Sequence, residues 1–145
     1  MSAATVNVEI INVLGVKGKT SVNFDSIIRK GFSIEALERF KKTFQMDEET
    51  LARSIGVSRK TLQRKRKKSA RQKLNVEESN RLFRMVRILT MATETFGGDK
   101  KVATEWMQEP QYGLGGMTPL KMLETDAGTE KVESLLLHLQ YGGVA

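Results

Sequence analysis

Apolar residues recur at helical rather than alternating spacing along most of this 145-residue sequence, and only two prolines, Pro110 and Pro119, interrupt it. Apolar positions that repeat every three or four residues place one apolar side on each helix, whereas strands need strict alternation. Few helix breakers in such a pattern favour helices throughout. The sequence therefore predicts an all-α fold.

Capping residues mark where these helices begin and end. From Asn23 a short helix is predicted to reach Gly31, and the longest helix is predicted to open at Asn75 in a capping box with Glu78. The other predicted starts are Ser33, Asp47, Ser58, Asp99 and Thr118 followed by Pro119, with stops at Gly56, Gly97-Gly98 and Pro110, a loop at 111–117 and a last helix over 129–140. The first 22 residues are ambiguous, because Val6, Val8 and Ile10 alternate as in a strand, while Val8, Ile11 and Leu14 suit a helix, which we favour.

Composition limits the class of protein. The chain is 39% hydrophobic and 28% charged, so it should fold, as one domain or two small ones. No apolar run approaches the length of a membrane span, and the start lacks the layout of a secretory signal. With no cysteine, disulfide scaffolds, thiol catalysis and cysteine-bound zinc are excluded. We expect a soluble cytoplasmic protein without membrane contact.

A basic run lies between Arg59 and Lys73, with 9 Lys and Arg residues and no acid. Without it the formal net charge of +7 falls to −2, so the rest of the chain is nearly neutral. Such a concentration is typical of an element that binds a polyanion, although a solvated helix face would have the same composition. The run also marks the one plausible domain boundary, between residues 23–73 and 74–145, while residues 1–22 form an N-terminal segment of uncertain structure.

A helix-turn-helix pattern precedes and overlaps the basic run, from Asp47 to Lys65. Ala52 is small enough for two helices to cross closely, and Gly56 can take the left-handed conformation of the turn. Leu62 would anchor the second helix against Leu51 and Ile55. An ordinary helical hairpin could carry the same spacing, but the cap at Ser58 and the basic second helix favour a DNA-binding motif.

The second helix of this motif would then enter the major groove with its N-terminal part. Gln63 is the residue type that pairs with adenine, Arg59 and Arg64 are the type that pairs with guanine, and Lys65 to Lys68 suit phosphates. The predicted DNA-binding residues are Ser58, Arg59, Lys60, Thr61, Gln63, Arg64, Lys65 and Lys67.

Nothing in the sequence favours catalysis. The single histidine, His138, has no acid at the neighbouring positions of its helix turn, Ser134 and Gly142, and a partly buried structural role is the simpler interpretation. The glycine clusters at 97–98 and 113–116 lack the pattern of a phosphate-binding loop. Glu77 and Glu78 suit helix capping. We therefore expect no catalytic residue, no cofactor and no metal site.

The second half of the chain resembles a known family. The segments ESNRLFRMVRI at 78–88, FG at 96–97, ATEWM at 103–107, GGMTPL at 115–120, LETDAG at 123–128 and LQYG at 139–142 look like the toxin-binding domain of Xre/MbcA/ParS-type antitoxins. The helix-turn-helix matches the Xre-like half of the same family, so the resemblance extends from about Ile27 to Gly142. It implies an N-terminal Xre-like helix-turn-helix bundle followed by a small helical toxin-binding domain.

The resemblance implies an antitoxin of a bacterial type II toxin-antitoxin pair. Its toxin would be a RES-domain enzyme that depletes NAD, covered at its active site by the antitoxin's C-terminal domain and tail. The helix-turn-helix would repress the pair's own operon, reading its operator as a homodimer within a larger complex. The implied toxin-binding residues are Gly115, Gly116, Leu135, Leu137, His138, Tyr141 and Gly142.

Simpler interpretations remain open. The glycines at 115 and 116 suit a tight loop, Trp106 suits the core, and the leucines of the last helix are more often core than interface. Leu135, Leu136, Leu137 and Leu139 are nevertheless too many for one buried stripe, so Leu137 is a candidate for a partner contact. A plain helix-turn-helix regulator whose second half dimerises or senses a ligand is the alternative, and an RNA-binding or localisation patch at Arg64 to Lys68 is a weaker one.

Overall fold

The computed structural model describes residues 3–15, 23–69 and 72–142. In these residues the backbone is helical, with a single β-bridge between Ser33 and Lys73 and no strand, which confirms the all-α prediction. The described helices are α1 (Ala3–Leu14), α2 (Phe24–Lys30), α3 (Ile34–Thr43), α4 (Glu48–Ile55), α5 (Arg59–Lys68), α6 (Val76–Thr95), α7 (Lys100–Met107), the 3-10 helix η1 (Tyr112–Leu114), α8 (Pro119–Met122) and α9 (Asp126–Gln140).

Side-chain caps explain where most helices begin. The hydroxyl of Ser33 accepts a hydrogen bond from the amide of Ala36 at 3.1 Å, and the carboxylate of Asp47 accepts one from Thr50 at 2.7 Å. At the start of α6, the side chain of Asn75 accepts from the Glu78 amide at 2.8 Å, while the Glu78 carboxylate accepts from the Asn75 amide at 2.9 Å. These reciprocal bonds confirm the predicted capping box.

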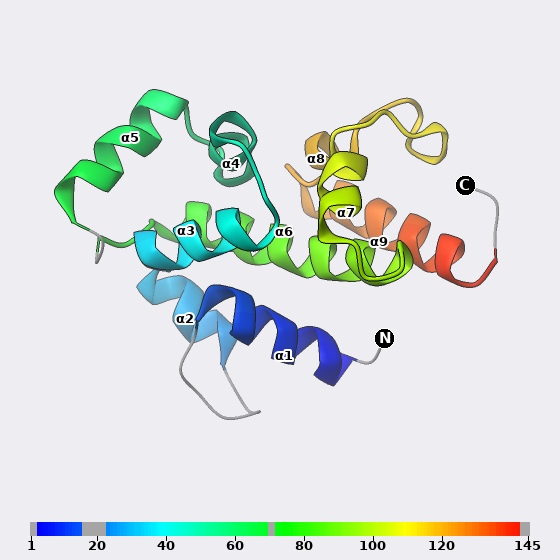
Figure 1. Cartoon of the computed structure of the whole chain (residues 1–145), viewed down its shortest axis with the longest axis horizontal. Coiled ribbons are helices and arrows are strands. Elements are labelled where there is room, and N and C mark those ends of the chain that lie inside the picture. Colours follow the sequence, from blue (N-terminus) through cyan, green and yellow to red (C-terminus); the bar gives the residue numbers. More distant parts are fainter. Residues whose placement is uncertain (1–2, 16–22, 70–71, 143–145) are drawn as a thin grey trace.

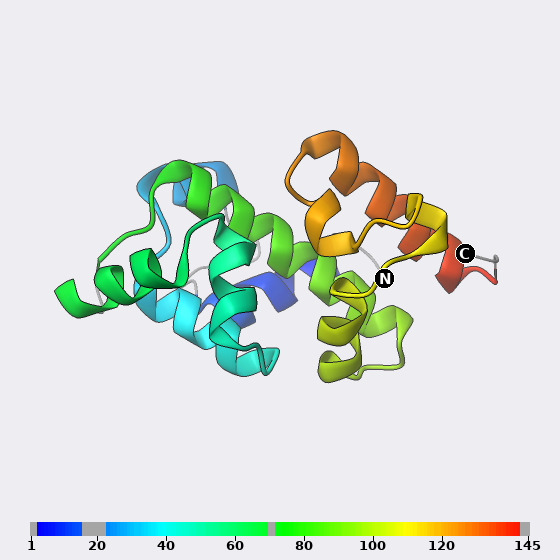
Figure 2. The same cartoon turned by 90° about the horizontal axis from the view of Figure 1, so that it is seen from above.

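Helix α6 is the centre of the fold. It packs against α1, α2, α4, α7 and α9, and α1 meets its second half, where Glu9 and Val13 line a hollow together with Thr90 and Thr93. Figures 1 and 2 show α5 at one end of the long axis and the C-terminal end of α9 at the other, with α1 and α2 on the opposite side of α6 from α4, α5 and α8. Residues such as Leu82, Val86, Ile88 and Leu89 are fully buried in one continuous core. One helix therefore supports both halves of the protein.

The N-terminal segment forms a helix, as the interpretation favoured from its sequence predicted. Ile10, Val13 and Leu14 of α1 are buried against α3 and α6. Because these residues lie three and four positions apart, they share one helical side, and the alternating pattern at Val6 to Ile10 does not produce a strand. Residues 1–2 and 16–22 lie outside the described residues.

Two predicted boundaries near the C-terminus differ from the structure. The loop at 111–117 contains the short helix η1. Helix α9 begins at Asp126 rather than at Thr129, because the Thr125 hydroxyl caps it by accepting from the Gly128 amide at 2.9 Å. The predicted start therefore excluded Gly128, which belongs to α9. This glycine lies inside the first turn, where the backbone of α8 approaches it closely.

This close approach gives a first test. A Cβ added at Gly128 would lie 2.0 Å from the carbonyl oxygen of Met122, so Gly128→Ala forces backbone apart. We expect a loss of about 2 to 3 kcal/mol in the free energy of unfolding, although alanine ordinarily stabilises a helix relative to glycine. Urea denaturation measures the difference. The exposed Glu130 of the same helix provides the control, since Glu130→Ala should change stability little; equal stabilities for Gly128→Ala and the unaltered chain would refute the packing argument.

Candidate functional site

Helices α4 and α5 meet in the geometry that the helix-turn-helix pattern predicts. Gly56, between them, has φ 77° and ψ 30°, the left-handed conformation that favours glycine. Ala52 and Leu62 are buried where the two helices pack, and Leu62 is the one buried residue of α5. A helix attached by so little apolar area exposes most of its surface, as a recognition helix must.

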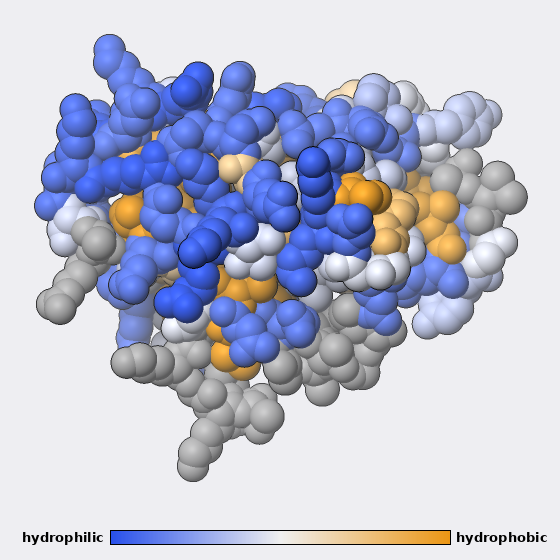
Figure 3. Space-filling view, in the orientation of Figure 1, coloured by the Kyte–Doolittle hydropathy of each residue, from blue (hydrophilic) through white to orange (hydrophobic). Residues whose placement is uncertain are grey.

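The exposed side of α5 is hollowed and almost entirely hydrophilic. A depression of about 400 Å³ is lined by Ser58, Lys60, Thr61, Gln63, Arg64 and Lys67. The end of the molecule that carries α5 is covered by hydrophilic residues (Figure 3). Six of the eight predicted DNA-binding residues thus line one accessible depression, and Arg59 is exposed at the first position of α5. Two of them, Ser58 and Thr61, also form the cap of α5, at 3.1 Å between the Ser58 hydroxyl and the Thr61 amide.

The eighth residue, Lys65, points into the protein instead. Its ammonium lies 3.2 Å from the carboxylate of Glu78, and both side chains are largely buried. The next residue, Arg66, pairs with Glu38 of α3 and Glu48 of α4. Sequence spacing alone assigned the whole stretch 65–68 to phosphates. The geometry divides it, because Lys65 and Arg66 hold α5 in place while Lys67 and Lys68 remain exposed.

The Arg66 pair responds to pH in a defined direction. The hydrogen bond from the Arg66 guanidinium lowers the pKa of Glu48 to about 2, from an ordinary value of 4.5, and Lys41 at 2.8 Å acts in the same direction. A carboxylate with a depressed pKa stabilises the fold above its unfolded pKa and loses that contribution as pH falls. The stabilisation is therefore present above pH 4.5 and disappears between pH 4.5 and about 2.

Glu48→Gln tests this dependence. Because the pair is partly exposed to solvent, we expect a loss on the order of 1 to 2 kcal/mol in the free energy of unfolding at neutral pH, shrinking as pH falls below 4.5. Urea denaturation across pH measures both. Glu49, an exposed neighbour, is the matched control, and Glu49→Gln should cost little at any pH. A Glu48→Gln deficit that stays constant with pH would contradict the assignment.

A second surface lies at the other end of the molecule, between η1, α8 and α9. It is a groove of about 860 Å³ with an apolar floor that includes Leu114, Met122 and Leu135, and Figure 3 shows apolar surface over α9. Polar residues of α9 form its rim, among them Glu130, Ser134 and His138. The groove is open rather than enclosed, which suits a protein partner.

The residues that the resemblance assigned to toxin binding fall into three groups. Gly115, Leu135 and His138 line the groove, although Leu135 is only 7% exposed and belongs mainly to the core. Leu137 and Tyr141, one helical turn apart, are 44% and 80% exposed. Packing within the chain therefore does not account for large apolar side chains at these two positions. Gly116 and Gly142 are exposed glycines with positive φ, beside the groove and after α9 respectively. The tail at 143–145 lies outside the described residues.

Two protein-family models match this sequence, one over each half of the chain. A model described as the antitoxin Xre-like helix-turn-helix domain matches residues 24–87, and one described as the antitoxin Xre/MbcA/ParS C-terminal toxin-binding domain matches residues 91–142. Over 115 residues, the chain is 34% identical to Antitoxin Xre of Yersinia enterocolitica, an alignment that covers 79% of this chain and 76% of that protein. The chain belongs to the Xre antitoxin family.

Two further relatives extend the comparison. Antitoxin Xre of Photorhabdus laumondii is 27% identical over 132 residues, covering 91% of this chain and 88% of that protein. A Sphingobium protein named Prs ADP-ribosylating antitoxin is 25% identical over 127 residues, covering 82% of this chain and 79% of that protein. In this Xre antitoxin, the helix-turn-helix is the DNA-binding element and the C-terminal domain is the toxin-binding element, as the resemblance implied.

Other residues of this Xre antitoxin differ from what the sequence indicated or were missed by it. His138 is exposed rather than partly buried. Trp106 is buried and stacks at a tilt on Phe96, with ring centroids 5.5 Å apart, which confirms its core role. Tyr112 is 93% exposed at the lip of the groove, and Met117 is exposed nearby. An aromatic residue in a glycine-rich loop was the signal that could have identified Tyr112.

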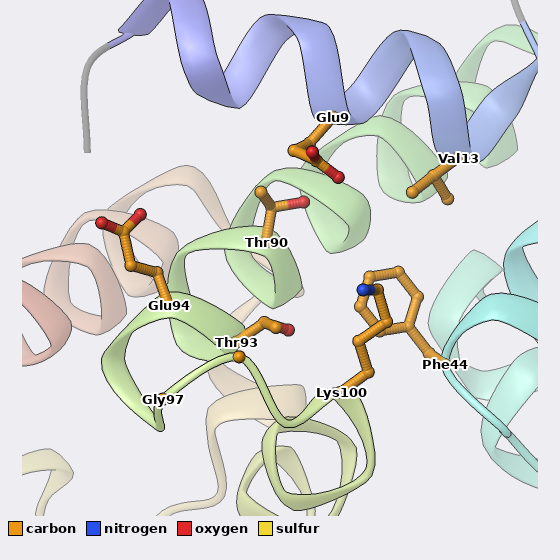
Figure 4. Close-up of a pocket in the computed structure, with 9 residues that line it drawn as sticks. Glu9, Val13, Phe44, Thr90, Thr93, Glu94, Gly97 and Lys100 are labelled. Atoms are coloured by element: carbon orange, nitrogen blue, oxygen red, sulfur yellow. The ribbon is translucent and has the colours of Figure 1, made fainter.

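A third hollow, of about 370 Å³, lies between α1, α6 and the start of α7 (Figure 4). Glu9 of α1 and Thr90 of α6 face each other across it, and Lys100 extends beside the ring of Phe44. The hydroxyls of Thr90 and Thr93 donate to backbone carbonyls of their own helix.

In the described residues, no cluster of three or more His, Cys, Asp or Glu side chains could hold a metal ion. The helices among them include none with the length and apolar character of a membrane span.

Proposed function

We propose that this antitoxin binds a RES-domain toxin that depletes NAD, and that α9 with the tail covers the toxin's active site. The observation that carries the proposal is that Leu137 and Tyr141 are exposed at the C-terminal end of α9, the helix that also lines the apolar groove. Exposed aromatic and aliphatic side chains around an apolar hollow are typical anchors of protein interfaces. The RES class itself rests on the family resemblance of segments 78–142.

The Sphingobium relative's name adds support for an NAD-consuming partner. That relative is named an ADP-ribosylating antitoxin, and ADP-ribosylation transfers ADP-ribose from NAD, the molecule that a RES toxin would deplete. We propose that the antitoxin itself is not an enzyme and acts by contact. The support is that charged residues such as Glu78, which bonds to Asn75 and Lys65, are engaged in caps and ion pairs.

We further propose that the helix-turn-helix represses the operon of the antitoxin and its toxin. The support is the exposed, basic side of α5, which has the size and the residue types for one major-groove contact. A single such contact gives little specificity, whereas two related by symmetry read an inverted repeat. The proposal therefore includes a homodimer that works in the bacterial cytoplasm and that assembles, with toxin bound at the far end, into a larger complex.

Co-expression tests the toxin half of this proposal. The gene adjacent to that of the antitoxin is expressed alone and with the antitoxin, while growth and total cellular NAD are measured. We expect growth arrest and NAD loss with the neighbour alone and recovery of both with the antitoxin. ADP-ribosylated protein in place of NAD loss would replace the RES class by a transferase. Failure of the antitoxin to restore growth would refute neutralisation.

The second candidate is a regulator that senses a small ligand. The hollow between α1, α6 and α7 is the observation that favours it, because Glu9, Lys100 and an aromatic ring converge there (Figure 4). Glu9→Ala combined with Lys100→Ala separates the two candidates. Loss of repression with intact neutralisation would support ligand sensing, whereas unchanged repression would leave the antitoxin as the sole function.

A further inference from the structure

Three arginines of α6 follow one another at intervals of three residues, and only two of them are neutralised. The guanidinium of Arg84 donates to the Leu123 carbonyl at 2.7 Å and lies 2.6 Å from the carboxylate of Asp126. Arg87 pairs with Glu133 of α9. Arg81, at the end of the row nearest the helix-turn-helix, forms no ion pair or hydrogen bond with any residue that the structure describes.

The Arg81 guanidinium lies directly over the turn of the helix-turn-helix. A Cβ added at Gly56 would lie 2.2 Å from Nη1 of Arg81, so the absence of a side chain at Gly56 makes room for this cation. Arg81 is half-buried, and a guanidinium removed from part of its water without a counter-ion is unfavourable. The position therefore favours an anion from outside the chain.

Two more cations share this place. Arg53 of α4, Arg81 and Lys121 of α8 line one pocket of about 250 Å³ at the turn, together with a single carboxylate, Glu124. The ammonium of Lys121 lies 3.1 Å from Glu124, but both side chains are about half exposed, at 56% and 45%, so this pair is weak and can be exchanged. Arg53 has no ion-pair partner in the described part of the chain. The pocket therefore carries excess positive charge.

The pocket adjoins the start of the recognition helix. Gly56 and Val57 line it, and the next residue, Ser58, caps α5 and lines the depression proposed for DNA. In the view of Figure 1, helices α4, α5 and α8 all lie above α6. Duplex DNA held against α5 brings its phosphates along the flanks of that helix, where cations fix its register.

We infer that Arg53, Arg81 and Lys121 form a binding site for a phosphate of the DNA backbone. Because Lys121 belongs to the C-terminal toxin-binding domain, this domain touches DNA as well as toxin. The inference rests on the DNA binding proposed for α5 and adds a second contact from another part of the chain. Phosphate is the matching ligand because a concave cluster of cations binds a compact anion, and duplex DNA presents phosphates at the adjacent surface.

Salt-dependent binding of the full chain to duplex DNA tests the site. The variants are Arg81→Gln and Lys121→Gln, measured with a random-sequence duplex and with the duplex upstream of the antitoxin gene. Each should weaken binding to both duplexes by a similar factor, about three- to tenfold, and lower the log-log salt slope by about 0.9. Glu124→Gln should strengthen binding, since it removes the competing carboxylate.

Controls separate this site from the fold and from the recognition helix. Lys101→Gln, an exposed lysine of α7, should leave DNA binding unchanged, and thermal unfolding shows whether Arg81→Gln remains folded. Lys121 is exposed, so its variant tests the site even if the Arg81 variant unfolds. Unchanged salt slopes for Lys121→Gln and Glu124→Gln, while Arg64→Gln weakens binding, would overturn the inference. A loss confined to toxin binding would also overturn it, and an unaltered chain without salt-dependent DNA binding would refute the parent proposal.

Discussion

Replacing Leu137 and Tyr141 together by alanine should weaken toxin binding by about 30- to 1,000-fold, the range for removal of one or two interface anchors. Both side chains are exposed on one side of α9, so their removal opens no cavity and should change the free energy of unfolding by less than about 0.5 kcal/mol. Titration calorimetry with purified toxin measures the affinity, and growth under co-expression measures neutralisation.

Val76→Ala is the matched control for this experiment. Val76 is an apolar residue that is 52% exposed, close to the 44% of Leu137, but it is the first residue of α6 and belongs to neither α9 nor the lining of the groove. Full neutralisation by the double variant would refute the role of α9. Point substitutions are sharper here than a truncation at Leu135, because Leu136 is buried and Gln140 donates to the Thr95 hydroxyl at 2.9 Å. Such a truncation would disturb the fold together with the interface.

Replacing Arg59 and Arg64 together by alanine should reduce affinity for the upstream duplex by about 100-fold or more, because each is positioned to bind a base or a phosphate. Both are exposed, and alanine favours helix, so α5 should persist. The salt slope should fall by about 0.9 for every phosphate that the variant no longer neutralises. Fluorescence anisotropy over a range of salt concentrations measures both quantities.

Lys101→Ala controls for the removal of positive charge, since Lys101 is an exposed lysine far along the chain from α5. The double variant should still neutralise the toxin, because α9 lies at the other end of the molecule (Figure 1). Unchanged affinity and slope in the double variant would exclude α5 as the recognition helix.

Local chemistry made much of the fold predictable. Caps such as Ser33 and Asp47, and the capping box at Asn75, act over three residues, so the sequence alone contains the whole interaction. Gly128 shows where such reasoning fails. The helix predicted over 129–140 leaves this glycine outside, whereas it lies in the first turn of α9 and allows the Met122 carbonyl to approach. That approach depends on how α8 and α9 pack.

The functional surfaces were predictable where they depend on local spacing, and unpredictable where they depend on contacts between distant residues. The spacing from Asp47 to Arg64 located the recognition helix, because turn geometry and helix periodicity fix which side is exposed. Lys65 was assigned to DNA because its charge is visible in the sequence and its partner Glu78 is not. Arg81 stands in the segment 78–88 without a role that the sequence assigns, since its place over Gly56 depends on the packing of α6 against the motif.

The shared helix α6 restricts how such antitoxins can be recombined. The two family matches change over between residues 87 and 91, within one helix whose residues at that point, Ile88 and Leu89, are fully buried. In a chimera joined there, α6 would combine residues from two parents and would have to pack against helices from both. Exchange of toxin specificity between relatives should therefore succeed only when the whole of α6 comes from one parent. The residues through which α6 contacts the other parent's helices must then be redesigned.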